Sequence, residues 1–386
     1  MKPANSILSG YGTTIFTVMS QMAVEYDAVN LGQGFPDVDG PEDIRKHAAD
    51  SLMMDSNQYP PMMGLPDLRQ AVADHNRRFY DLDIDWQSEV MVTSGATEAL
   101  ADAIFGLIEP GDEVVLIEPL YDCYLPLVRR AGGIPKTVRI EPPAWDLDQA
   151  ALAGVFSEKT KLLILNNPMN PAAKVFNGDE LAFIAGLLQQ YDAYALCDEV
   201  YEHLVFDGRA HIPLMTLPGM RERCVRVGSA GKTFSLTGWK IGYITAPANL
   251  LQPIAKAHQF FTFTTPPNLQ KAVAYGLRQD DGYYRAFQAD LEAKRDLLAS
   301  GLKAQGWWVP DSQGTYFVSA DITPFARESE DDVAFCTRLT QDVGVAAVPI
   351  SAFYDSDAPR SFIRFCFCKR EPVLQEALEK LSVLNT

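Results

Sequence analysis

Residues 229–243 read SAGKTFSLTGWKIGY and continue an apolar run, CVRV, that is typical of a buried strand. Lys232 therefore stands among small and hydroxylated residues just beyond a strand, where a solvated loop lysine would be the ordinary interpretation. Its neighbours favour another one. Small residues such as Gly231 let the backbone approach a ligand closely, and Ser229 and Lys240 supply a hydroxyl and a second cation, both suited to a phosphate. We interpret the stretch as part of a ligand site.

The middle of the chain repeats this alternation of short apolar runs with helical segments. The other runs are EVMVTSG (89–95), EVVLIEP (113–119), KLLILNNP (161–168) and AYALCDEV (193–200). Each run stops at polar or small residues, and helical segments separate most of them. This pattern predicts an α/β fold with a mostly parallel sheet that is covered by helices on both faces.

In a sheet of this kind the ligand lies outside the carboxyl ends of the strands. The residues found there are polar, aromatic or small: Gly95, Ala96, Thr97, Tyr121, Asn170, Asp198, Tyr201, Ser229 and Lys232. We expect these side chains to converge on one rim of the sheet.

Three features of the sequence can be explained either by a structural role or by ligand binding. A carboxylate at the end of a buried strand, Asp198, needs a partner, which can be a cap, a salt bridge or the protonated ring nitrogen of a cofactor. Thr93 or Ser94 can be a plain helix cap, or the helix start can bind phosphate. Arg364, in the apolar SFIRFCF, can form an internal salt bridge or hold a substrate carboxylate bidentately.

Composition excludes several classes of protein. The 386 residues carry a formal net charge of −17, which disfavours nucleic acid as a partner. No apolar run is long enough to span a membrane, and the start lacks a signal-peptide pattern, so we expect a soluble, cytoplasmic protein. The six cysteines, including the Cys366 and Cys368 pair, and the five histidines show no metal-binding spacing, so we expect no metal site.

Taken together, the chain resembles the class I and II aminotransferases of fold type I, which use pyridoxal 5′-phosphate (PLP). The matching stretches, in family order, are NQYPPMMGLPDLRQAVA, TSGATEAL, NNPMNPAAKV, DEVYEHLVF, SAGKTFSLTGWKIGY and SFIRF. Within the family, LGQGFPD, EPLYDCY and GTYF are most similar to bacterial methionine aminotransferases and to kynurenine (glutamine transaminase K-like) aminotransferases. Thr264 stands where the kynurenine enzymes carry a histidine, which weakens that assignment.

The resemblance implies roles around the cofactor ring. Lys232 is the Schiff-base lysine and proton shuttle, and Asp198 pairs with the pyridine nitrogen. Asn170 and Tyr201 hydrogen-bond the ring 3′-oxygen, and Tyr121 stacks on the ring face.

It also implies a phosphate site and a substrate site. The phosphate site consists of the amides of Ala96 and Thr97, the side chains of Ser229 and Lys240, and Tyr59 from across a dimer interface. Arg364, the Gly34 amide and Asn170 bind the substrate α-carboxylate. The expected walls of the side-chain pocket are Phe16, Tyr59 and, from the partner subunit, Phe263.

We therefore predict a three-layer α/β large domain over 46–279 and a small α+β domain built from 1–45 and 280–386. The predicted enzyme is a homodimer that moves the amino group of methionine, phenylalanine or tyrosine to a 2-oxo acid by a ping-pong mechanism. The alternatives are a kynurenine aminotransferase, a PLP-dependent β-lyase acting on cysteine S-conjugates or cystathionine, and a non-catalytic regulator that retains the fold. Release of pyruvate and ammonia without an added 2-oxo acid would favour the lyase.

Overall fold

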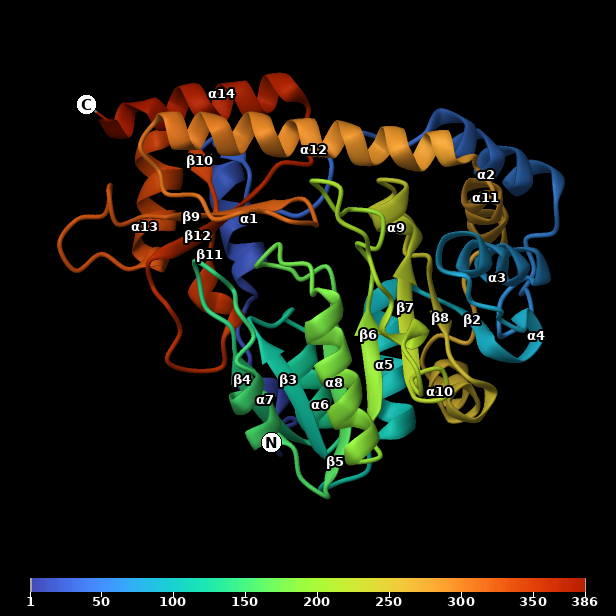
Figure 1. The fold of residues 1–386 in the computed structure, drawn as a ribbon. Coiled ribbons are helices and arrows are strands. Elements are labelled where there is room, and N and C mark those ends of the chain that lie inside the picture. The colour runs from blue at the N-terminus through green and yellow to red at the C-terminus, as the bar shows by residue number, and fades with distance from the viewer. Residues whose placement is uncertain (1, 386) are drawn as a thin grey trace.

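The computed structural model describes residues 2–385 and is built around a seven-stranded sheet (Figure 1). Its strand order is β2-β8-β7-β6-β5-β3-β4. The strands are β2 (Val90–Thr93), β3 (Glu113–Glu118), β4 (Ile134–Arg139), β5 (Thr160–Asn166), β6 (Tyr194–Asp198), β7 (Cys224–Ser229) and β8 (Gly242–Thr245). Within this sheet β8 runs antiparallel to both neighbours, while the pairs from β7 to β4 are parallel. The prediction of a mostly parallel sheet is confirmed.

Helices cover both faces of the sheet, which explains why its strands are continuous apolar runs. Alternate residues of β3 face opposite ways: Val114 and Leu116 join one buried cluster, and Val115 and Ile117 join the other. The first cluster includes residues of α5 (Gly95–Leu107) and α10 (Ala248–Phe261). The second includes residues of α3 (Pro66–Tyr80) and α8 (Gly178–Gln190). The remaining helices around this sheet are α2 (Glu42–Met54), α4 (Trp86–Glu89), α6 (Tyr124–Arg130), α7 (Gln149–Val155), α9 (Ala230–Thr233) and α11 (Pro267–Leu277).

The small domain combines both ends of the chain. Its antiparallel sheet has the order β11-β12-β9, and β1 pairs in parallel with β10. The strands are β1 (Val29–Asn30), β9 (Phe317–Asp321), β10 (Val345–Ala346), β11 (Val348–Pro349) and β12 (Phe362–Cys366). The helices are α1 (Ile15–Glu25), α12 (Asp281–Ala304), α13 (Asp332–Arg338), the π-helix η4 (Leu339–Val343) and α14 (Glu371–Leu381). The short 3-10 segments of the whole chain are Leu8–Gly10, Leu214–Thr216, Thr237–Trp239, Ile350–Phe353 and Ser382–Asn385.

The long helix α12 begins in the region of α2 and α11 and extends across to lie beside α14 (Figure 1). It begins at Asp281, next to the predicted domain boundary at residue 280, whereas the predicted boundary at residue 46 falls within α2. Both boundaries remain predictions. Over residues 2–385, no helix combines the length and the apolar character needed to cross a membrane.

Candidate active site

The residues expected at the rim of the sheet line one cavity of about 150 Å³. It opens at the carboxyl ends of β5, β6 and β7 and at the start of α5, as the strand pattern predicted. The predicted residues that line it are Ala96, Thr97, Tyr121, Asn170, Asp198, Tyr201, Ser229, Lys232 and Lys240.

Lys232 lies in the short helix α9, directly after β7, and its amine reaches into the cavity. Nζ donates a hydrogen bond of 2.8 Å to the hydroxyl of Tyr316, which in turn donates one of 2.6 Å to the Gly34 carbonyl. No carboxylate among residues 2–385 lies within ion-pair distance of this amine. Burial lowers the pKa of Lys232, which favours the neutral amine, the form that acts as a base or a nucleophile.

Asp198 ends β6, and its two carboxylate oxygens have different surroundings. Oδ2 accepts a hydrogen bond of 2.5 Å from the Tyr124 hydroxyl, whereas Oδ1 has no hydrogen-bond partner within residues 2–385 although it is buried. Burial raises the pKa of Asp198 to about 6, and the bond from Tyr124 opposes that rise. Because a buried acceptor is costly to leave unpaired, Oδ1 suits a cationic N–H donor. No salt bridge, one of the two structural alternatives, occupies this carboxylate in the described chain.

The start of α5 is arranged for an anion. Ser94 is at the N-cap position but its side chain makes no capping hydrogen bond, so the plain cap is not the reason for its position. Gly95 has a φ of +75°, and a Cβ placed on it would lie 3.2 Å from Nζ of Lys240. The ammonium group therefore stands beside the amides of the first helical turn. Helix amides and an ammonium group together favour a phosphate.

Arg364 lies in β12 and is almost completely buried. It donates 2.7 and 2.8 Å hydrogen bonds to Asn170 Oδ1 and to the Gly32 carbonyl, and its guanidinium carbon lies 3.9 Å from the Phe317 ring centroid. Its Nε has no partner in residues 2–385, and no carboxylate there forms an ion pair with it. The internal salt bridge considered from sequence is absent from that part of the chain, and the guanidinium keeps a donor for a ligand.

A second cavity of about 620 Å³ shares Thr97 and Tyr121 with the first, so the two adjoin. Phe16 lines it, in edge contact with Phe353 at a ring-centroid distance of 5.5 Å. The other lining residues are Tyr11, Gly12, Thr13, Thr14, Ile15, Leu120, Asp122, Cys123, Leu125, Pro126, Leu127, Ala352, Tyr354 and Asp355. Two of them are acidic and none is basic.

Four predicted site residues line neither cavity: Gly34, Arg364, Tyr59 and Phe263. Arg364 is bonded to Asn170, which lines the first cavity, and the Gly34 carbonyl accepts from Tyr316. Tyr59 and Phe263 meet in an edge contact at 5.7 Å, with 84% and 43% of their surfaces exposed. Within one chain neither residue reaches Lys232, so the roles expected of them require a second subunit.

Three further residues belong to the site although the sequence did not single them out. Tyr124 binds Asp198, and Tyr316 binds Lys232. Asn166 accepts a hydrogen bond from the Asn170 amide at 2.7 Å and donates one to the Asp198 carbonyl at 3.0 Å. Each lies in a stretch that resembles the family (EPLYDCY, GTYF and NNP), but spacing along the chain does not reveal which of its polar residues turns inward.

Comparison with known proteins gives concordant matches. The family model for aminotransferase class I and II matches residues 26–381. A probable N-succinyldiaminopimelate aminotransferase of Mycobacterium tuberculosis is 44% identical, with 98% of each chain covered. Human kynurenine–oxoglutarate transaminase 1 is 38% identical, covering 94% of this chain and 93% of its own. A solved structure from Escherichia coli, described as having a methionine aminotransferase function, superposes with a TM-score of 0.96 at 40% identity, covering 99% of this chain and 100% of that one.

Proposed function

Because this chain belongs to the class I and II aminotransferases, we propose that it moves the amino group of an L-amino acid with an apolar or aromatic side chain to a 2-oxo acid. Methionine, phenylalanine and tyrosine are the proposed donors. The two substrates use one site in turn, which gives ping-pong kinetics.

The family uses PLP, and the residues of the cavity fit that cofactor. When bound, PLP supplies an electron sink for the negative charge that develops at the substrate Cα. Oδ1 of Asp198 is the free acceptor for the ring N–H, and Asn170, Tyr201 and Tyr121 surround the ring position. The phosphate site consists of the Ala96 and Thr97 amides with Ser229 and Lys240. Tyr59 of a second subunit completes this site.

The chain's own residues account for binding and proton transfer. Arg364, with one unpaired donor, holds the substrate α-carboxylate together with Asn170 and the Gly34 amide. Lys232, whose pKa is lowered by burial, would remove the Cα proton and deliver it to the C4′ carbon of the bound cofactor. Tyr316 holds the lysine amine in position through its hydroxyl.

The observation that carries the substrate proposal is the lining of the second cavity. Asp122 and Asp355 line it without any lysine or arginine among its lining residues in the described chain. Asp355 is paired with Arg129 at 2.7 Å, and Arg129 also donates to the Tyr11 hydroxyl, so this neighbouring cation is already engaged. A distal carboxylate would find no cation among the described lining residues, and leaving it unpaired in a partly buried site costs several kcal/mol. An apolar side chain instead gains about 0.8 kcal/mol for each methylene that it buries against walls such as Phe16. Because such a pocket discriminates weakly among apolar side chains, we expect a broad specificity.

A homodimer is part of the proposal because exposed apolar side chains lie at and just beyond the end of α10, in the segment expected to reach a neighbouring subunit. Phe260, 78% exposed, lies in the last turn of α10, and Phe263, just beyond the end of that helix, contacts Tyr59. A large exposed apolar patch on a globular chain marks an interaction surface. The second copy would bring Phe263 to the second cavity of the first.

The test is kcat/KM for a panel of donors with one common 2-oxo acid. The panel contains methionine, phenylalanine, tyrosine, leucine, glutamine, kynurenine, aspartate and glutamate, together with N-succinyldiaminopimelate because of the mycobacterial relative. Methionine and the aromatic amino acids should lead. A higher kcat/KM for aspartate, glutamate or N-succinyldiaminopimelate would refute the substrate proposal. The highest kcat/KM for kynurenine would instead assign the chain to the kynurenine aminotransferases. Pyruvate and ammonia formed from a cysteine S-conjugate without a 2-oxo acid would establish the lyase alternative.

A further inference from the structure

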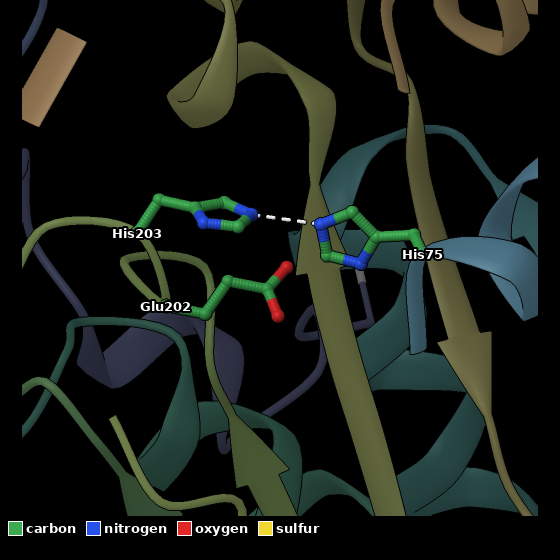
Figure 2. Close-up of side chains that lie close together, drawn as sticks. All are labelled: His75, Glu202 and His203. Carbon is green, nitrogen blue, oxygen red and sulfur yellow. Dashed lines mark hydrogen bonds between the residues drawn. The ribbon is translucent and has the colours of Figure 1, made fainter. Parts of the chain in front are cut away.

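A second group of converging polar side chains lies apart from the active-site cavity. It consists of His75 near the end of α3 and of Glu202 and His203 in the turns after β6 (Figure 2). The two Nε2 atoms lie 2.7 Å apart, and the candidate ligand atoms of the three residues all lie within 4.8 Å of one another. Figure 2 shows the Glu202 carboxylate directed toward the space beside the two rings.

This group and the active site are lined by consecutive residues that face different cavities. Tyr201 lines the cavity that contains Lys232, whereas the next residue, Glu202, lines a different and much smaller cavity with His75, Arg226 and Tyr243. The function proposed above therefore uses none of the three residues, and the inference does not depend on it.

Charge in this region favours a cation. Burial lowers the pKa of both imidazoles, that of His75 to about 4, so both rings are uncharged at neutral pH. Each neutral imidazole has one nitrogen lone pair. In the 2.7 Å Nε2–Nε2 hydrogen bond one ring donates and the other accepts, so a metal ion that replaces this bond takes one lone pair from each ring. Arg226 contacts the carboxylates of Glu199 at 2.6 Å and Glu202 at 3.1 Å, which keeps both ionised. His211 also lies beside Glu199, at 3.1 Å. When His75, His203 and His211 are all uncharged, two carboxylates face one guanidinium and one buried negative charge is left unbalanced.

The other comparable group in residues 2–385 lacks these properties. It contains Glu98, Asp102 and His258, and both nitrogens of His258 are already engaged, Nδ1 with Glu98 and Nε2 with the Met62 carbonyl, each at 3.0 Å. Although burial opposes protonation, the Asp102 and Glu98 carboxylates raise the pKa of His258 to about 9. A protonated ring has no lone pair for a metal, so this group is an ion-pair cluster.

We propose that His75, Glu202 and His203 bind one divalent first-row transition-metal ion, with Zn²⁺ the best match. Two imidazole nitrogens and one carboxylate form a ligand set that zinc sites use, with a water as the fourth ligand. Ligand nitrogens of a tetrahedral zinc site lie about 3.3 Å apart when each is about 2.0 Å from the metal. The two Nε2 atoms, now 2.7 Å apart, must therefore move slightly away from each other to bind the ion. His203 is half-buried, which leaves the ion a route from solvent.

The expected consequence is structural. The ion would join α3 to the segment that follows Asp198 and Tyr201, two residues of the active-site cavity. A ligand that binds the folded chain and not the unfolded one raises stability with its concentration. Zn²⁺ should therefore raise the melting temperature of the protein without being needed for the chemistry.

The experiment uses PLP-loaded protein that has been dialysed against a chelator and then freed of it. Titration with Zn²⁺ should give one bound ion per chain and a higher melting temperature. The variants His203→Gln and Glu202→Gln should bind at least about tenfold more weakly, since changes to residues that merely support metal ligands already cost that much. The matched control is His47→Gln, because His47 stacks on Tyr275 away from the cluster, and it should bind like the parent.

Cofactor absorbance and circular dichroism establish that each variant is folded. Co²⁺ gives a second measurement on the unsubstituted protein: its spectrum should lack thiolate charge transfer. A thiolate band would assign the ion to Cys366 and Cys368, whose sulfur atoms lie 3.2 Å apart, and would overturn the proposal. Absence of Zn²⁺ binding, or equal binding by folded His203→Gln and the parent, would also overturn it and leave the two histidines as a plain hydrogen-bonded pair.

Discussion

At the scale of single residues, Arg364 is unusual because it is buried yet has no carboxylate partner within residues 2–385. Replacing it by alanine should raise KM for amino acids far more than it weakens cofactor binding. Truncating one partner of a buried charge pair costs roughly 2–5 kcal/mol, which is on the order of 30- to 3,000-fold in affinity.

Steady-state kinetics with methionine, and PLP affinity measured by fluorescence, separate the two effects. Arg338→Ala is a suitable control, because Arg338 pairs with Glu330 in the small domain. An unchanged KM in the Arg364 variant would mean that the α-carboxylate binds elsewhere.

His75 should make the protein sensitive to acid. Burial lowers its pKa to about 4 in the folded chain, whereas an unfolded histidine titrates near 6.5. The unfolded state therefore takes up the proton first. The stability that neutral His75 contributes is complete above about pH 6.5 and is lost as the pH falls toward 4. From pH 7 to pH 5 the loss amounts to about 2 kcal/mol.

The measurement is denaturant unfolding of the parent and of His75→Gln at pH 7 and pH 5, with a chelator present so that metal binding does not contribute. The parent should lose about 2 kcal/mol more than the variant over this range. Identical losses would show that His75 titrates normally in the folded protein. Titrating groups away from His75, such as Asp198, are common to both proteins and cancel in this comparison. His203 and Glu202 interact with His75, so the difference reports the titration of this cluster as a unit.

At the scale of elements, the carboxyl ends of β5, β6 and β7 were predictable because their apolar runs end abruptly at polar residues. That signal is local in the sequence, and it is enough to place Asn170, Asp198 and Lys232 on one rim. The signal failed for β4, whose residues are mostly only partly buried and include Pro135 and Lys136. It also failed for β8, which is four residues long and overlaps the end of the lysine stretch. Neither strand has an apolar run of the kind that marks the others.

Other contacts between distant elements could not be predicted from the spacing of residues along the chain. His75 and His203 are 128 positions apart and meet only because α3 packs beside the segment after β6. The expectation of no metal site came from spacing along the chain, which carries no information about such a pair. Tyr124 was missed as the partner of Asp198 for the same reason, since the two lie 74 positions apart.

The end of α10 should form part of a subunit interface. Phe260→Asp would place a charge in a surface that the proposed dimer buries, and burying an unpaired charge is costly. The variant should therefore dissociate to monomers in analytical ultracentrifugation and lose activity as it does so. Val333→Asp, on the exposed side of α13, is the matched control and should remain dimeric. A fully active monomeric parent at assay concentration would refute the interface.

At the scale of the whole molecule, the proposed function requires this acidic protein to bind anionic groups. The net charge of −17 repels both a phosphate and a substrate carboxylate at long range. Lys232 and Lys240 line the cavity, and Arg364 reaches it through Asn170, so a small group of basic residues provides local attraction where the fold brings β7 and β12 together. These residues come from both parts of the chain, so the site depends on the two domains being packed against each other.

The central claim is that Lys232 holds the cofactor and carries out the proton transfer. Borohydride reduction of the yellow, PLP-loaded protein, followed by peptide mapping, identifies the lysine that holds the cofactor. We predict the label on Lys232 alone, and loss of transamination in Lys232→Ala but not in Lys256→Ala, a change at an exposed lysine of α10. A label on another lysine, or no bound cofactor after reconstitution with PLP, would contradict the account.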